Sequence, residues 1–529
     1  MKPQINTDSH RLFNKKQEGR RKKPEKIFPF IFCILHLASC LLPLASDSYA
    51  SEWQKPGLID AGTGDAFRTS LAFDPYGNAM AVFEQFTEGV YRIYANQFLP
   101  DRGGWQRPII VDAGPRNAYM ARVAFDRKGD AIAIFKQSDG NIYRIYANHF
   151  IRSKGWQKPV EIDSGTGDAD GHQITFDADG NAAVVFEQKF MGIYRIYANQ
   201  YRGKEGWQGA VAIDSGKSNG YFPYPLFDYH GNIYVIYYKE EGVGLEVYMS
   251  RYDEGKKMWN EPIRLTDGNT VVKHEDWNKK RSDVNRGIRG IYNPLFLEEI
   301  KKRVYAGNYT YNVKRFETPS KIDSRFRDAY TPSIVCDKNG RVFAFFVKWD
   351  GEHQRGYMAK YRDRDGWSKP EIIDSKGGDV EHIRAAINSK GEIALVFTQW
   401  VDTKVTGHQS PVTSLRIHAR LCSPDSGWGK AEIIDAGEKD AYGPNVIYNG
   451  DNKIIVIWCQ WEVETVKTYR NDYIKERGWE KAVRVEMEDE TCGGCGLRIA
   501  ASPNGMLIAI FELKASVKDR TKIYAIDER

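Results

Sequence analysis

The stretch Tyr91-Arg-Ile-Tyr-Ala-Asn96 recurs unchanged at residues 143–148 and 194–199. Each copy closes a unit of about fifty residues that begins with a tryptophan, and a period of this length is typical of folds built from one repeated structural unit. The tryptophans that begin the units are Trp53, Trp105, Trp156, Trp207, Trp259, Trp367, Trp428 and Trp479.

Apolar residues within a unit alternate with a period of two, which is the pattern of β-strands. In the first unit a short strand leads into a hairpin turn at Asp74-Pro-Tyr-Gly-Asn78. We expect further strands at 79–85, 91–98 and 106–112. Four short antiparallel strands per unit, with almost no helical periodicity, predict an all-β fold, a β-propeller of four-stranded blades.

The two ends of the repeat array are complementary. Residues 53–60 match a fourth strand, whereas the chain ends on three strands, the last at 523–526. We therefore expect the N-terminal strand to complete the last blade and close the ring, which removes an exposed sheet edge. The spacing between Trp259 and Trp367 is about two periods, so residues 291–323 could form an extra blade. The sequence predicts eight or nine blades.

The first fifty residues differ in composition from the rest. A basic stretch at 20–26 precedes an apolar run at 27–45, which is the pattern of a secretory signal peptide. Cleavage after Ala50 would leave residues 51–529 as a single propeller domain. A competing interpretation makes Cys40, which follows Leu-Ala-Ser, a lipidated N-terminus, and only this interpretation attaches the protein to a membrane. We expect an exported protein that is periplasmic, attached to the outer membrane or extracellular.

Charge and cysteine content narrow the possible functions. The first fifty residues hold nine of the 76 Lys and Arg and four of the 70 Asp and Glu, which leaves 67 basic and 66 acidic residues. This near balance gives no reason to expect a nucleic-acid partner. Five cysteines after residue 50 are too few for a disulfide scaffold. Cys492 and Cys495 are separated by two glycines, and we expect them to form a local disulfide rather than a metal site; no metal or cofactor is expected.

The pairing of an Asp-x-x-Gly-Asn-Ala hairpin with a Gly-Trp corner resembles bacterial secreted propellers, and it is similar in shape to WD-repeat and sialidase-type propellers. The resemblance covers residues 53–529 and implies a fold, but no particular function, because propellers include enzymes, receptors and scaffolds.

Residues that recur in every unit are expected to serve the blade itself. We expect a cross-strand ion pair between Glu84 and Arg92. The aspartates that recur at the position of Asp60 and the glutamines at the position of Gln85 are expected to hydrogen-bond strand ends to loops. Residues 177–180 match a hairpin turn better than a calcium loop.

Breaks in the repeat point to a binding face. The connections between blades lengthen on one face, most of all in the insertion at residues 269–290, and such insertions commonly lie on the binding face. On the same face, one position of the innermost strand varies and is arginine in three units. The candidate ligand-binding residues are Arg122, Asp170, His172, Tyr221, Trp277, Glu381, His382, Arg384 and Arg498.

Two functions remain open. The main interpretation is a binding or scaffold propeller without catalysis, which recognises a protein or glycan partner through the face that carries the insertions. The alternative is a sialidase-like glycoside hydrolase or lyase, in which arginines grip an acidic glycan and Glu381 or Asp170 supplies acid–base chemistry. The alternative requires the three arginines to approach one another beside a carboxylate.

Overall fold

The computed structural model consists of two units, Met1–Glu52 and Trp53–Arg529. It describes residues 56–165, 167–241, 244–266, 332–350, 352–362, 365–403, 412–437, 439–450, 453–462, 465–485, 491–492, 497–514 and 520–528. Five sequence predictions lie outside these residues: the predicted signal peptide, Cys40, the insertion with Trp277, the extra-blade candidate at 291–323 and Cys495.

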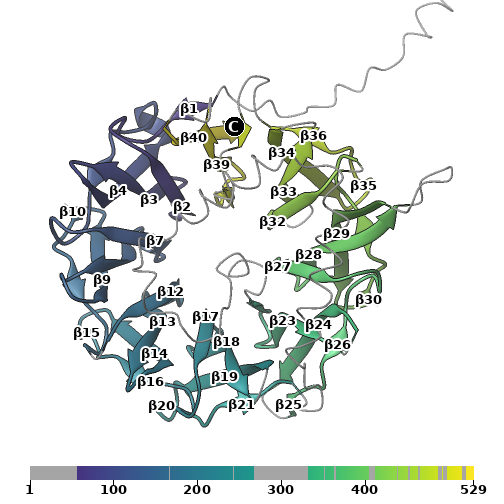
Figure 1. The fold of residues 1–529 in the computed structure, drawn as a ribbon, viewed down its shortest axis with the longest axis horizontal. Helices are drawn as coiled ribbons and strands as arrows, with labels where there is room; N and C mark the ends of the chain where they lie inside the picture. Colours follow the sequence, from purple (N-terminus) through teal and green to yellow (C-terminus); the bar gives the residue numbers. More distant parts are fainter. Residues whose placement is uncertain are drawn as a thin grey trace, which may run out of the picture. The chain divides into compact units, whose positions relative to one another are not determined.

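The described strands form eight antiparallel sheets, which are the blades of a β-propeller (Figure 1). Blade 1 contains β2 (Ala66–Phe73), β3 (Ala79–Thr87), β4 (Val90–Leu99), β5 (Gly104–Trp105) and β6 (Ile109–Ile110). The short β5 and β6 both pair with β4, so they are two pieces of one outer strand. The prediction of a continuous strand at 106–112 is wrong, because Pro108 lies between the pieces and has no N–H to donate.

Blades 2 to 4 repeat this order. Their strands are β7 (Ala118–Phe125), β8 (Ala131–Ser138), β9 (Tyr143–Ile151), β10 (Gly155–Trp156) and β11 (Val160–Glu161); β12 (Ala169–Phe176), β13 (Ala182–Phe190), β14 (Ile193–Arg202), β15 (Gly206–Trp207) and β16 (Val211–Ala212); and β17 (Gly220–Phe227), β18 (Ile233–Glu241), β19 (Gly244–Asp253), β20 (Met258–Trp259) and β21 (Ile263–Arg264).

Blades 5 to 7 keep the same plan. Their strands are β22 (Ser333–Cys336), β23 (Val342–Trp349), β24 (Gln354–Arg362), β25 (Gly366–Trp367) and β26 (Glu371–Ile372); β27 (Val380–Ile387), β28 (Ile393–Thr403), β29 (Val412–Ser423), β30 (Gly427–Trp428) and β31 (Glu432–Ile433); and β32 (Ala441–Asn449), β33 (Lys453–Glu462), β34 (Thr465–Ile474), β35 (Gly478–Trp479) and β36 (Val483–Arg484).

Blade 8 joins the two ends of the array. It contains β37 (Thr491–Cys492), β38 (Arg498–Ala501), β39 (Leu507–Lys514), β40 (Lys522–Glu528) and the N-terminal β1 (Gly57–Leu58), which pairs with β40. The buried carboxylate of Asp60 follows β1 and accepts hydrogen bonds from the Ile523 amide and the Arg520 guanidinium, both at 3.0 Å. The predicted closure by the N-terminal strand is therefore confirmed.

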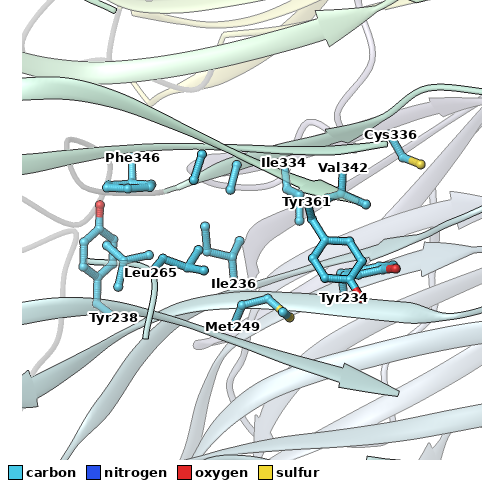
Figure 2. Packing of buried hydrophobic residues seen from close by; sticks show 13 residues of the cluster. Tyr234, Ile236, Tyr238, Met249, Leu265, Ile334, Cys336, Val342, Phe346 and Tyr361 are labelled. Atoms are coloured by element: carbon cyan, nitrogen blue, oxygen red, sulfur yellow. The ribbon is translucent and has the colours of Figure 1, made fainter. Parts of the chain in front are cut away.

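The described blades number eight because blades 4 and 5 are direct neighbours. Tyr238 and Ile236 of blade 4 share one hydrophobic cluster with Ile334 and Phe346 of blade 5, as Figure 2 shows. The Tyr238 hydroxyl also donates to the Val347 carbonyl oxygen at 3.3 Å. This packing leaves no room for a blade between the two.

Residues of the repeated string each make a different contact. In blade 1, the Tyr94 ring stacks on Phe83 with centroids 6.0 Å apart. Asn96 donates from Nδ2 to the Ile59 carbonyl oxygen at 2.8 Å, which links blade 1 to the outer strand of blade 8. Arg92 donates to both carboxylate oxygens of Asp112. Stacking within a blade and hydrogen bonding between blades explain why this string recurs.

The expected ion pair between Glu84 and Arg92 is wrong. Arg92 lies opposite Gln85 in the β3–β4 register, and Glu84 lies opposite Ile93. Adjacent strand residues point to opposite faces of a sheet, so Glu84 and Arg92 face away from each other. Glu84 instead pairs with Arg68 at 2.8 Å.

The expected hydrogen bonding by recurrent glutamine and aspartate residues is confirmed. In blade 2, Gln137 accepts from the Ala113 amide at 2.9 Å and donates to the Gly114 carbonyl oxygen at 3.1 Å. Asp177 accepts from the Asn181 amide within its hairpin at 2.8 Å, as expected for a turn.

Helix is almost absent from the part of the chain that the structure describes. Its one helical element is the 3-10 turn η1 (Pro100–Arg102), and no described helix is long and apolar enough to cross a membrane.

Candidate functional site

The innermost strand of blades 1 to 4 contains a β-bulge. The bulge lies near the start of the strand, at the end away from the hairpin that leads to the second strand. The register with the second strand shifts there, between Phe67 and Ser70 in blade 1 and between Tyr119 and Arg122 in blade 2. The third residue of this innermost strand has a positive φ in all four blades: Arg68 (54°), Met120 (59°), Gly171 (61°) and Phe222 (55°). Bulges of this kind commonly re-aim side chains next to functional sites.

Buried glutamates hold the bulges across the blade boundaries. The Arg68 amide donates to Glu512 Oε1 at 2.6 Å, and the Met120 amide donates to Glu84 Oε1 at 2.6 Å. In each case the glutamate belongs to the preceding blade. Burial raises the pKa of Glu84 and of Glu512, because desolvation disfavours the charged carboxylate.

Three candidate residues, Arg122, Asp170 and His172, come together between blades 2 and 3. Asp170 pairs with the buried Lys136 at 2.9 Å. His172 Nε2 lies 2.6 Å from the Met120 carbonyl oxygen, and since a carbonyl only accepts, Nε2 carries the proton.

Burial, reinforced by the charge of Arg122, lowers the pKa of His172 to about 3. The imidazole is therefore neutral at neutral pH. Its Nδ1 atom is buried and has no hydrogen-bond partner among the described residues. A group that is only 2% exposed cannot reach a ligand directly, so in this arrangement His172 positions the Met120 backbone.

A row of tyrosines lies beside this cluster. Tyr91 at the start of β4 contacts Tyr119 of the next blade with centroids 5.4 Å apart, and Tyr119 lies 6.0 Å from Tyr143. The Lys136 ammonium is 5.2 Å from the centre of the Tyr143 ring. We call Tyr91, Tyr119 and Tyr143 the tyrosine row; all three are half-buried.

The tyrosine row was not predicted from the sequence. Tyr91 and Tyr143 belong to the repeated string, so they were assigned to the blade itself. One sequence feature could have indicated the row. The repeated string begins with a tyrosine in three blades, at a strand end next to solvent where packing does not require an aromatic ring.

Tyr221 lies on blade 4 and has a different neighbourhood. Its hydroxyl donates to Glu240 Oε1 at 3.0 Å, and its ring lies 6.3 Å from Tyr194. Burial and the charge of Glu240 raise its pKa, so the hydroxyl stays protonated.

Glu381, His382 and Arg384 share strand β27 of blade 6. Trp400 Nε1 donates to Glu381 Oε1 at 2.8 Å, and the His382 amide donates to Thr398 Oγ1 at 2.9 Å. Burial raises the pKa of Glu381, and the charges of Asp379 and Asp440 add to the effect. A half-buried carboxyl group with a raised pKa is suited to general acid chemistry.

The three candidate arginines share one conformation but not one site. Arg122, Arg384 and Arg498 each donate from Nη1 to the carbonyl oxygen of the preceding residue, at 3.0, 2.9 and 2.8 Å. They lie on blades 2, 6 and 8. Blades 2 and 6 are four positions apart in a ring of eight, so Arg122 and Arg384 face each other across the ring. The described candidates thus divide into a group on blades 2 and 3, a group on blade 6, and two separate residues, Tyr221 on blade 4 and Arg498 on blade 8.

A cavity of about 440 Å³ lies at the hairpins between first and second strands, at the opposite ends of the inner strands from the bulges. Its lining includes Phe73, Phe125, Phe176 and Phe227, together with the turn aspartates. Among the described residues, no group of three or more His, Cys, Asp or Glu side chains could hold a metal ion. The disulfide between Cys492 and Cys495 stays a prediction, because these side chains lie outside the described residues.

The chain matches no protein-family model and no curated protein. Solved structures with a similar fold include an ulvan lyase of polysaccharide lyase family PL25, with 11% identity over 82% of this chain and 98% of that chain and a TM-score of 0.43. A second polysaccharide lyase has 9% identity over 93% and 95% of the two chains and a TM-score of 0.43. A GH93 α-L-arabinofuranosidase of Fusarium graminearum has 12% identity over 78% and 93%, with a TM-score of 0.36. Similarity at this level carries no argument about the function of this chain.

Proposed function

We propose that this protein binds an acidic glycan on the face of blades 1 to 3 that carries the bulges of the innermost strands. The tyrosine row lies on this face, beside the bulges. The observation that carries the proposal is the continuous contact of Tyr91, Tyr119 and Tyr143 across a blade boundary. Aromatic side chains combine a large apolar surface with a polar hydroxyl, which suits the mixed apolar and hydroxylated faces of a sugar.

The charges around the row favour an anionic ligand. Arg68 is 30% exposed, whereas its partner Glu84 is only 1% exposed. Arg122 is half-buried, and Glu512 is buried. Glu84 and Glu512 therefore point inward and hold the backbone, while the Arg68 and Arg122 side chains are partly exposed to solvent. Asp170 is the exception, because it is 17% exposed and pairs with the buried Lys136. Guanidinium groups bind carboxylates and sulfates through paired hydrogen bonds.

A second candidate function is cleavage of the same class of glycan, as in the hydrolase or lyase alternative. The three arginines do not share one site, so this candidate no longer rests on an arginine clamp and instead rests on the blade 6 residues alone. The observation that favours it is the raised pKa of Glu381 beside His382 and Arg384 on one strand. A raised pKa favours the protonated form of a glutamic acid, which is the form that can protonate a glycosidic oxygen. Near the tyrosine row, Glu84 and Glu512 are buried and Asp170 forms an ion pair with Lys136. We therefore place cleavage on blade 6 and not beside the tyrosine row.

The test uses the purified full-length protein with polygalacturonate and hyaluronan as acidic probes and dextran as the neutral control. Calorimetric titration should show binding to an acidic probe that weakens with added salt, because exposed charge contacts are screened. Cleavage would appear as new reducing ends or as the ultraviolet absorbance of an unsaturated uronate. Binding to none of the probes would contradict the proposal and direct attention to protein partners.

We also propose that the protein is exported. Expression with a Cys40→Ala substitution, followed by fractionation and mass measurement of the N-terminus, separates cleavage after Ala50 from lipidation.

A further inference from the structure

Met120 has a backbone conformation that its side chain disfavours. At the equivalent bulge position, blades 3 and 7 have Gly171 and Gly443, with φ of 61° and 64°. Glycine tolerates this left-handed region, whereas a residue with a Cβ is strained there. Met120 keeps a long side chain at this position, so the strain requires an explanation.

Two other bulges with strained residues have structural explanations. Arg68 forms an ion pair with Glu84, and Phe222 packs against the hydrophobic cluster between blades 4 and 5. Met120 belongs to none of the hydrophobic clusters formed by the described residues. Packing of the core therefore does not account for its side chain.

Both polar groups of the Met120 backbone are held by neighbouring blades. Its amide donates to Glu84 of blade 1, and its carbonyl oxygen accepts from His172 of blade 3. The two partners are 1% and 2% exposed, so these hydrogen bonds are shielded from water. One residue thus connects three blades, and its position is fixed before any ligand arrives.

We propose that Met120 is a ligand-contacting residue whose thioether packs against the apolar face of a sugar ring next to Tyr119. This inference rests on the proposed glycan binding and adds a specificity residue to it. Strained residues persist where function requires them, and the polarisable methionine side chain adapts to irregular apolar surfaces.

The experiment compares Met120→Gly and Met120→Leu with the wild type, with polygalacturonate and hyaluronan as probes. Met120→Gly should raise the urea midpoint of unfolding, because it relieves the strain, and weaken binding about tenfold. Met120→Leu should retain most of the affinity, because it keeps an apolar side chain of similar size. Gly443→Met is the matched control. No atom lies within 4 Å of the added Cβ, so the substitution adds backbone strain without a clash. It should lower the urea midpoint and leave binding unchanged.

Three results would overturn the inference. Unchanged binding by Met120→Gly would show that the side chain does not contact the glycan. A lower urea midpoint of the same variant would show that Met120 serves packing. An unchanged midpoint in Gly443→Met would remove the strain argument. If the wild type binds neither probe, the proposed function itself fails, and this is visible before any variant is made.

Discussion

His418 is the residue whose replacement should most clearly change the stability of the fold. In blade 6 it stacks on Phe397 with centroids 5.2 Å apart and planes 9° apart. The same place is a tyrosine stacked on an aromatic ring in other blades, as in the Phe83–Tyr94 and Phe186–Tyr197 pairs. His418 is 4% exposed, and neither ring nitrogen has a hydrogen-bond partner among the described residues.

Burial, with a contribution from the charge of Arg416, lowers the pKa of His418 to about 4 from its ordinary 6.5. Because the folded-state pKa lies below the unfolded one, the neutral ring contributes stability that is fully present above pH 6.5. This contribution is lost as the pH falls toward 4. At about 1.4 kcal/mol per pKa unit, the loss is about 3 kcal/mol.

We therefore expect His418→Phe to flatten the decline of unfolding free energy between pH 7 and pH 4 by about 3 kcal/mol. At pH 7 the variant should gain about 1 kcal/mol or more, because two buried polar atoms without partners are removed. Urea unfolding followed by fluorescence at several pH values measures both. Subtracting the two curves cancels titration of His172, which both proteins share.

The matched control is His230→Phe, at an exposed hairpin position. It should leave the unfolding free energy at pH 7 close to that of the wild type, because the side chain lies outside the core. If His418→Phe has the same pH slope as the wild type, or is less stable at pH 7, the stacking argument for this residue is refuted.

Three further predictions concern ring closure and the proposed site. Asp60→Ala should lower the unfolding free energy by about 3 kcal/mol, because the Ile523 amide and the Arg520 guanidinium lose their buried partner; thermal melting measures this, with the exposed Asp101→Ala as the control. Tyr119→Ala should weaken binding of polygalacturonate or hyaluronan about tenfold in calorimetry, whereas Tyr76→Ala, on an exposed hairpin, should bind like the wild type. If cleavage occurs, Glu381→Gln should abolish it without changing affinity; retained cleavage would move the acid elsewhere.

The fold was predictable because its determinants are local. The hairpin turns rest on aspartates that accept from amides two and four residues later, such as Asp74 with Tyr76 and Asn78. The Trp105 ring contacts Phe98 of the adjacent strand at 5.4 Å. Contacts over such short sequence separations leave a periodic trace, so the blade type followed from the pattern. Ring closure followed instead from the complementary ends of the array, which pair in the structure.

The candidate site was only partly predictable. Arg122, Asp170 and His172 were predictable because they interrupt the repeat, and they do lie together in the structure. The repeated Tyr91 and Tyr143 were not predictable as site residues, because recurrence from unit to unit indicates a role in the blade. The predicted pair of Glu84 with Arg92 is wrong, because the two lie on opposite faces of the sheet. A register difference of one residue reverses the face on which a side chain lies, and the repeat pattern does not encode it.

The sequence by itself determined the repeated blade and the hairpins, because these depend on neighbours within about fifty residues. It also determined the strand that closes the ring, because the two ends of the array are complementary, even though Asp60 and Ile523 lie 463 residues apart. The tertiary structure alone decided that Arg122 and Arg384 lie across the ring from each other. It also decided that Glu84 and His172, from blades 1 and 3, hold the backbone of Met120. Such contacts depend on the number of blades and on the bulge geometry, which arise only when the whole ring has closed.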